Sequence, residues 1–283
     1  MSGSKAGGMP ERNDPPEGRG RGSHGPGRAS ALGRTWASDA PITTSDALRA
    51  LNEGELQVVG RIAEASNATF LCELRVPWEL PGGAPLLHVV YKPIRGERPL
   101  DDFPDRTLAM REVSAWLVSQ ATGWDVVPPT VLRDGPAGRG MAQLWIDIDE
   151  SADVLEMILT RDGRLRRIAV LDAVINNADR KGGHLLPTPR GLVHGCDHGV
   201  CFSVDPKLRT VLWGWRGDPL TVDELAVLSD LRRQMDGTLG RDLRELLAGT
   251  EVDMTCRRLD RLMRDASMPM PDPYRHAIPW PPF

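Results

Sequence analysis

The pattern of apolar and polar positions predicts strands in the first half of the chain. Alternation in ELQVVGRIAEASNATFLCELRV predicts two strands joined by a turn at residues 65–68, and LLHVVYKP predicts a third strand. VVPPTVLRD and MAQLWIDI predict two more strands, joined by the Gly- and Pro-rich turn DGPAGRG. We therefore expect a mainly antiparallel sheet within residues 44–147.

Apolar residues at helical spacing predict helices around and after this sheet. The first would end before Gly54 and the second before Gly123. Capping-box-like pairs that begin at Thr221 and Thr250 predict further packing helices near the C-terminus. The final segment, residues 269–283, is too rich in proline to continue as a helix. The helices expected before residue 220 span residues 45–52, 105–121 and about 164–176.

Length and charge narrow the class of protein. A chain of 283 residues with 40% hydrophobic content can bury one good core, or two small lobes that share a cleft. The net charge of −4 gives no reason to expect nucleic acid as the main partner. Four cysteines without a C-x-x-C pair indicate reduced thiols in a cytoplasmic protein. We find no transmembrane-length apolar run and no apolar signal core.

The N-terminal region has the composition of a disordered tail. Residues 1–42 contain nine Gly, five Pro and five Ser with almost no aliphatic side chains, so they bury too little surface to offset the entropy of ordering. We expect residues 1–43 to be disordered. A basic docking arm is the alternative, although acidic residues dilute its arginines.

The chemistry is concentrated in residues 170–202, VLDAVINNADRKGGHLLPTPRGLVHGCDHGVCF. Two acids, Asp179 and Asp197, stand on loops that border apolar segments. In kinase-type folds a catalytic Asp is followed five residues later by a metal ligand, and another Asp after a short hairpin holds the magnesium. Asp179 and His184 have the five-residue spacing, and Asp197-His198-Gly199 stands where such folds have Asp-Phe-Gly.

These loops resemble a known family. LDAVINNADRKGGH followed by HGCDHGVCF is similar to the catalytic and metal-binding loops of the phosphatidylinositol 3- and 4-kinase (PI3/PI4-kinase) superfamily, most of all to type II 4-kinases and the small bacterial proteins grouped with them. The resemblance is sharp over residues 171–202 and looser over residues 56–215.

The resemblance implies a fold and a reaction. The expected fold class is α+β: a two-lobed protein-kinase-like fold with an antiparallel β N-lobe at residues 44–147 and a helical C-lobe at residues 148–266. A Pro-rich C-terminal tail would follow at residues 267–283. ATP would bind between the lobes, and its terminal phosphoryl group would pass to a hydroxyl of an unknown acceptor: a lipid, a protein or a small molecule.

Site roles follow from the same resemblance. Asp179 would accept or orient the proton of the acceptor hydroxyl. Arg180 would steady that loop or the phosphate. Asp197 and His184 would hold the metal. The family usually has Asn where this chain has His184, and imidazole suits Mn²⁺ or Zn²⁺ better than Mg²⁺, so the ion is expected to be Mg²⁺ or Mn²⁺.

The nucleotide lobe has its own candidates. Lys92 ends a strand, where it is either an edge-strand gatekeeper or the lysine that contacts the α- and β-phosphates. Glu112 is either its ion-pair partner or an ordinary solvated glutamate. Ser66 and Asn67 lie in a hairpin of small residues that would cover the phosphates.

The segment between the lobes would meet the base. If the kinase interpretation holds, residues 143–146, which include Gln143 and Trp145, form the linker whose backbone meets the adenine.

Two other readings of the pattern stay open. The first is a catalytically silent kinase fold that acts as a nucleotide-binding scaffold. The second is a zinc site built from residues of one strand and its surroundings, because Cys and His form a zinc-type ligand set. The zinc candidates are His194, Cys196, His198 and Cys201, with His184 as a further one.

Trp213 and Trp215 are expected to pack in the core, although paired tryptophans there also resemble the substrate segment of the lipid kinases.

Overall fold

The computed structural model describes residues 3, 42–63, 67–79 and 86–283, and the helices and strands it describes all belong to one compact unit, Thr35–Phe283. Most of the tail predicted at residues 1–43, and Ser66 in the first hairpin, lie outside the described residues.

The predicted strands form one antiparallel five-stranded sheet. Two strands differ from their predicted bounds. β4 begins at Thr130, after Pro128 and Pro129, which have no N–H to donate to a neighbouring strand. β5 begins as early as Gly138, because the turn that precedes it is only two residues long. In spatial order the strands are β1 (Glu55–Arg61), β2 (Phe70–Arg75), β3 (Leu87–Pro93), β5 (Gly138–Leu144) and β4 (Thr130–Gly135).

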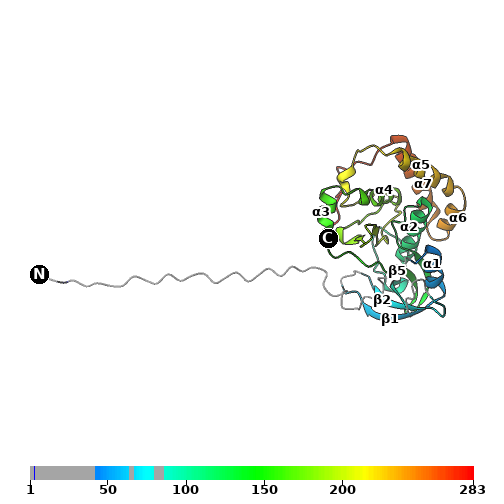
Figure 1. The fold of residues 1–283 in the computed structure, drawn as a ribbon. Coiled ribbons are helices and arrows are strands. Elements are labelled where there is room, and N and C mark those ends of the chain that lie inside the picture. The colour runs from blue at the N-terminus through cyan, green and yellow to red at the C-terminus, as the bar shows by residue number, and fades with distance from the viewer. Residues whose placement is uncertain (1–2, 4–41, 64–66, 80–85) are drawn as a thin grey trace. The chain divides into compact units, whose positions relative to one another are not determined.

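Helices dominate the second half of the chain, which together with the sheet makes the fold α+β, as predicted (Figure 1). We call α1 with β1–β5 the sheet lobe and α3–α7 the helical lobe. The helices are α1 (Thr44–Glu53), α2 (Leu108–Thr122), α3 (Val154–Leu159), α4 (Arg166–Ile175), α5 (Val222–Met235), α6 (Thr238–Arg244) and α7 (Gly249–Asp265). A short hairpin of β6 (Leu185–Pro187) and β7 (Val193–Gly195) lies in the helical lobe.

Local chemistry explains where the helices start. Thr43 caps α1 by accepting a hydrogen bond from the Asp46 N–H, and α1 ends before Gly54 as predicted. α2 begins three residues later than predicted, because Arg106 has a left-handed backbone (φ 62°) that cannot continue a right-handed helix. The predicted end at Gly123 is confirmed, with φ 66°.

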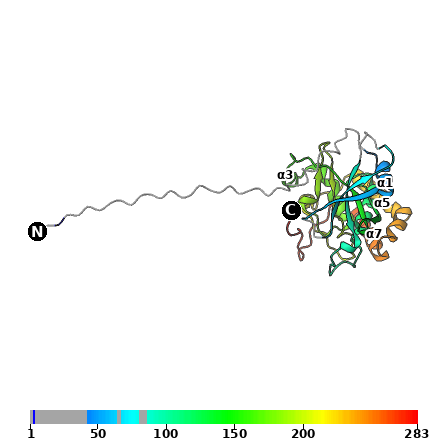
Figure 2. The ribbon, with the colours of Figure 1, turned by 90° about the horizontal axis from the view of Figure 1, so that it is seen from below.

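Each lobe has its own hydrophobic core, and α2 lies between the two. Ala115 and Val118 on α2 pack into the helical-lobe core, while Ala109 and Val113 pack with Met141 of the sheet. The strands lie nearest the viewer in Figure 2, with the helices behind them. A residue on α2 can therefore contact both lobes.

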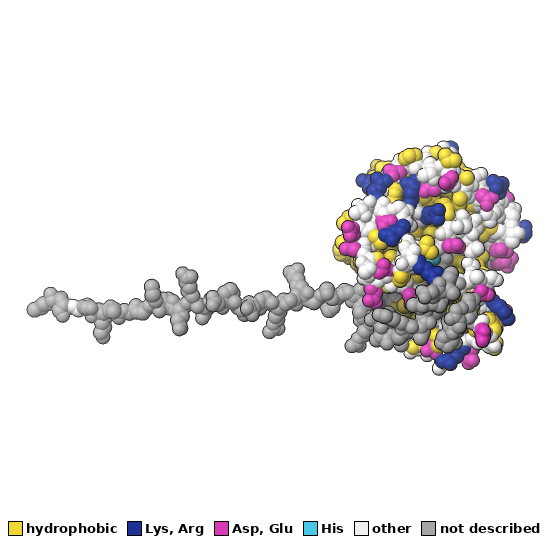
Figure 3. Space-filling model, in the orientation of Figure 1, with side chains coloured by type: hydrophobic (Ala, Val, Ile, Leu, Met, Phe, Trp, Pro, Cys, Tyr) yellow, Lys and Arg dark blue, Asp and Glu magenta, His cyan; other side chains and the backbone are white. Residues whose placement is uncertain are grey.

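On the face drawn in Figure 3, basic and acidic side chains are interspersed over the helical lobe. Among the residues that the structure describes, no helix is long and apolar enough to cross a membrane.

Candidate active site

Lys92 reaches the boundary between the lobes because of strand alternation. In β3, Leu87, Val89 and Tyr91 face the core of the sheet lobe, so Lys92 emerges on the opposite face together with Val90. Val90 packs against the cluster that contains α2 residues. The lysine therefore points toward α2.

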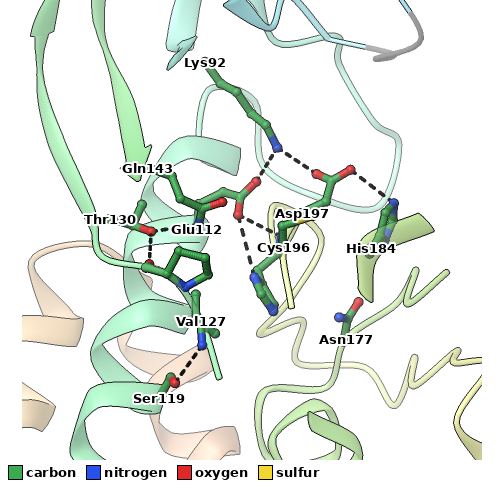
Figure 4. Close-up of polar contacts among 12 residues, drawn as sticks. Lys92, Glu112, Ser119, Val127, Thr130, Gln143, Asn177, His184, Cys196 and Asp197 are labelled. Atoms are coloured by element: carbon green, nitrogen blue, oxygen red, sulfur yellow. Dashed lines mark hydrogen bonds and ion pairs between the residues drawn. The ribbon is translucent and has the colours of Figure 1, made fainter. Parts of the chain in front are cut away.

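Glu112 receives that lysine. Its side chain is only 2% exposed, and Oε1 lies 2.6 Å from Lys92 Nζ (Figure 4). The other oxygen, Oε2, accepts a 2.8 Å hydrogen bond from the His198 backbone N–H. Of the two alternatives for Glu112, the structure supports the ion pair with Lys92, and a buried carboxylate requires such partners.

Asp197 completes the contact on the side of the helical lobe. Its Oδ1 lies 2.9 Å from Lys92 Nζ, and its side chain remains 52% exposed. The residue has a left-handed backbone (φ 59°), which Asp tolerates better than most residues and which turns the carboxylate toward the lysine. Three segments far apart in the sequence thus meet at one ammonium group.

The charges in this group stabilise one another. Lys92 holds the pKa of the Asp197 carboxyl well below its ordinary range. Burial lowers the pKa of Lys92, but the charges of Asp197 and Glu112 outweigh burial and raise it. Burial raises the pKa of Glu112 against the opposing effect of Lys92. We therefore treat Lys92 as charged and Asp197 as ionised at neutral pH.

The loop that carries Asp179 follows the end of α4. The helix stops at Asn176, whose backbone is left-handed (φ 55°). The next residue, Asn177, is fully buried, and its side-chain oxygen accepts a 2.9 Å hydrogen bond from the Asp179 N–H. Asp179 itself is 31% exposed, and its carboxylate lies 3.4 Å from Lys181 Nζ. Burial raises the pKa of Asp179 above its ordinary value.

Arg180 is turned away from solvent and holds this loop in place. It is fully buried and bonds both oxygens of the equally buried Asp172 at 2.9 Å. It also donates to the Cys196 carbonyl oxygen at 2.8 Å, which ties the loop to the residue before Asp197. Of the two roles predicted for Arg180, this geometry supports steadying the loop rather than contacting phosphate.

His198 lies between Arg180 and Glu112. Arg180 Nη2 lies 2.7 Å from His198 Nε2, and because a guanidinium can only donate, that nitrogen must be the acceptor. The ring proton is then on Nδ1, which lies 3.9 Å from Glu112 Oε2. Burial lowers the pKa of His198 well below its ordinary value, in agreement with a neutral ring.

His184, the other predicted metal ligand, lies next to Asp197. Its Nε2 lies 3.4 Å from Asp197 Oδ2 (Figure 4). Burial lowers the pKa of His184 to about 4, so the ring is neutral at physiological pH. Its Nδ1 accepts a 3.4 Å hydrogen bond from the Lys181 N–H, which leaves the ring proton on Nε2, so binding a metal through Nε2 would require the other tautomer. One carboxylate and one imidazole fit a divalent ion that takes its other ligands from phosphates and water.

The remaining nucleotide candidates are only partly at the site. Asn67 lines a cavity of about 20 Å³ together with Lys92, Glu112 and Asp197, and its side-chain oxygen accepts a hydrogen bond from the Arg98 N–H. A cavity of this size has room for about one water molecule. Ser66 falls outside the described residues, so its predicted role stays a prediction.

The predicted linker needs correction at its start. Gln143 is part of β5, and its buried side chain donates to Thr130 at 2.8 Å, so it is a strand residue rather than a linker residue. The Trp145 N–H donates to the His88 carbonyl oxygen and is not free to bond an adenine. The Trp145 N–H makes this bond because the pairing between β3 and β5 continues one residue beyond the end of β5.

The zinc alternative is wrong for the described residues. Among them, no three His, Cys, Asp or Glu side chains converge on a possible metal position. His198 faces Arg180 and Glu112 instead, and Cys201 is buried in the helical-lobe core. Trp215 is buried in the same core, which agrees with the packing role expected for it.

Two supporting residues escaped the sequence analysis. Asp172 and Asn177 hold Arg180 and the Asp179 loop, and neither was singled out. The signal for Asp172 was available: an acid inside the apolar run VLDAVI must find a partner when the helix is buried. Nothing local marks Asn177, because its bonds depend on how the chain turns after α4.

Comparison with known proteins identifies a relative of this chain. No protein-family model matches the chain. Among solved structures, the proinflammatory kinase CtkA of Helicobacter pylori is similar, with a TM-score of 0.44 and 13% identity over 77% of this chain and 94% of that chain. Protein Rv2133c of Mycobacterium tuberculosis is 44% identical over 268 residues, which cover 82% of this chain and 94% of the relative. The chain therefore belongs to the family of the mycobacterial Protein Rv2133c.

Proposed function

We propose that the protein is a kinase-type phosphotransferase, of the PI3/PI4-kinase kind, that uses ATP and a divalent cation. The observation that carries the proposal is the meeting of Lys92 with Glu112 at 2.6 Å and with Asp197 at 2.9 Å. Kinase folds need a strand lysine, a helix glutamate and a metal-binding aspartate in this chain order. With ATP as donor, the reaction would take place in the cytoplasm.

Lys92 would bind the phosphates of the nucleotide. Glu112 would fix the position of the Lys92 ammonium from the buried side, so that its charge could meet the phosphates once the contact with Asp197 opens. Because the site is partly shielded from water, this fixed charge stabilises developing negative charge more strongly than it would in solvent.

Asp179 would orient the acceptor hydroxyl and take its proton. Its loop is held by Asn177 on one side and by the buried Arg180 on the other. Burial raises the pKa of Asp179, which makes its carboxylate a somewhat better proton acceptor than an exposed aspartate.

Asp197 and His184 would hold the cation. Magnesium in such sites is usually bound by one or two protein ligands plus substrate phosphates, and the softer imidazole favours Mn²⁺. The bound ion would neutralise phosphate charge. Lys92 now bonds Asp197 directly, so nucleotide binding requires that contact to open.

A second candidate is a silent scaffold with a kinase fold. The direct contact of Lys92 with Asp197 and the cavity of only about 20 Å³ between them favour it, because a site without turnover can keep this ion pair closed. ATP turnover distinguishes the phosphotransferase from the silent scaffold.

The test is ATP turnover by the purified protein with Mg²⁺ or Mn²⁺, measured as release or transfer of the γ-phosphoryl group. Asp179→Asn should lower the rate by orders of magnitude. The control Asp205→Asn alters an exposed aspartate on a different loop and should leave the rate unchanged. ATP binding without any turnover would favour the scaffold. Equal rates in wild type and Asp179→Asn would show that Asp179 is not the acceptor's base.

A further inference from the structure

A second and larger cavity lies beside the candidate active site. It has a volume of about 270 Å³ and is formed by the segment between β3 and α2, including Arg95, Arg98, Phe103, Arg106 and Leu108. None of the side chains of these arginines takes part in the contacts of Lys92, Glu112 and Asp197 described above. Its volume approaches that of ordinary small-molecule sites.

The cavity is contiguous with the phosphate side of the site. Glu97 and Leu108 line both it and the small cavity at Lys92. On its other side, Phe103 and Leu108 pack against Ala178, the residue before Asp179. A molecule in the cavity would therefore lie next to the residue that handles the acceptor hydroxyl.

The wall of the cavity is positively charged, although the chain as a whole is acidic. Within the described part of the chain, the guanidinium groups of Arg95, Arg98 and Arg106 have no ion pair and no hydrogen bond. The wall also contains two acids, Glu97 and Asp105. The Glu97 carboxylate already accepts hydrogen bonds from the first two N–H groups of α2 at 3.1 and 2.8 Å, so Asp105 is the remaining negative charge against the three arginines.

Two further cations lie near Phe103 or the Asp179 loop. Lys207 Nζ lies 5.3 Å from the centre of the Phe103 ring, which lines the cavity, and is paired with Asp102. Arg209 is tied to the Asp179 loop by backbone bonds to Asn177 and Arg180. The buried Arg209 Nε has no hydrogen-bond partner among the described residues, and such a donor calls for an acceptor.

We propose that this cavity binds a phosphate monoester carried by the acceptor, so that the phosphoryl acceptor is a small hydroxyl compound with a phosphate group of its own. The planar guanidinium fork is suited to bidentate phosphate binding. The inference rests on the proposed function and names its acceptor class. In the reaction, the acceptor oxygen bonds the γ-phosphorus, the bond from that phosphorus to the β,γ-bridging oxygen breaks, Asp179 takes the hydroxyl proton, and ADP leaves.

The experiment is calorimetric titration of glycerol 3-phosphate into the full chain, with glycerol as the uncharged counterpart. Wild type should bind the phosphate compound and not glycerol. The double variant Arg98→Gln/Arg106→Gln should bind it about tenfold or more weakly, because it lacks two charge-assisted contacts. The matched control Arg257→Gln/Arg261→Gln removes two exposed arginines of α7 and should bind it like wild type.

Parallel titrations with ATP and Mn²⁺ separate this inference from the proposed function. ATP binding without any glycerol 3-phosphate binding, or equal binding by both double variants, overturns the inference and leaves the function standing. If the protein binds glycerol 3-phosphate but not ATP, the bound phosphate compound is not a phosphoryl acceptor, and the inference is overturned. Vesicles of phosphatidylcholine with phosphatidic acid test the lipid source of the same group. Binding of phosphate-free polyglutamate in place of the phosphate compound also overturns the inference.

Discussion

Replacing Arg180 by Met should destabilise the protein strongly, because Arg180 is fully buried and pairs with a buried carboxylate. Arg180 and Asp172 are both fully buried and are joined by two bonds of 2.9 Å. Removal of the guanidinium leaves the Asp172 carboxylate buried with only the Asn177 side chain as a partner. The hydrogen bond to the Cys196 carbonyl oxygen is lost as well.

The magnitude follows from the burial of the pair. Breaking a buried ion pair by removing one partner costs about 3–5 kcal/mol in the free energy of unfolding. For a domain of this size each kcal/mol lowers Tm by roughly 2–4 °C, so the expected loss is about 6–20 °C. Removing both charges, in Asp172→Asn/Arg180→Met, should recover part of this loss because no unpaired charge stays buried.

The assay is thermal unfolding followed by circular dichroism, with Arg244→Met as the matched control. Arg244 pairs with Asp253 on the surface, where the two side chains are 48% and 58% exposed, so its loss should cost less than about 1 kcal/mol. If Arg180→Met and Arg244→Met lower Tm equally, the buried network does not hold the Asp179 loop as we describe it.

Two further predictions concern the metal and the pH dependence of stability. His184→Asn should shift the metal preference of ATP binding from Mn²⁺ toward Mg²⁺, measured as the ratio of the two affinities; an unchanged ratio would remove His184 from the ligands. Burial raises the pKa of Glu224, but hydrogen bonds from Arg166 and the Thr221 N–H outweigh it, so the net pKa lies below the ordinary 4.5. The bonds of the ionised Glu224 therefore stabilise the folded protein fully at pH values above 4.5, and this stabilisation is lost as the pH falls through the lowered pKa of Glu224. Glu224→Gln should therefore be less stable than wild type at pH 7, with a gap that closes in acid; denaturant titrations that show a constant gap would contradict the assignment.

Local signals predicted the elements and the site residues that they carry. Alternation in LLHVVYKP placed Lys92 at the end of a strand, and helical spacing placed Glu112 near the buried face of its helix. Loop spacing and the family resemblance singled out Asp179 and Asp197. Strand alternation and helical spacing need only a few neighbouring residues, and the loop pattern lies within residues 171–202, so the sequence alone reveals them.

The features that could not be predicted depend on contacts between distant segments. The burial of Arg180 against Asp172 requires the loop after α4 to fold back over the helix. The left-handed backbone of Arg106, which delays α2, has no local signature in an arginine. The basic cavity joins arginines that the sequence cannot distinguish from other exposed arginines, because only the folded segment between β3 and α2 brings them together.

The most direct test of the central claim is calorimetric titration of ATP, with Mg²⁺ and with Mn²⁺, into wild type, Asp197→Ala and the control Asp223→Ala. Asp223 is an exposed aspartate in the first turn of α5, remote from the ion pair of Lys92. The account predicts metal-dependent binding by wild type and Asp223→Ala that Asp197→Ala loses. Absence of binding with either metal, or binding that Asp197→Ala retains, would contradict a nucleotide site built on Lys92, Glu112 and Asp197.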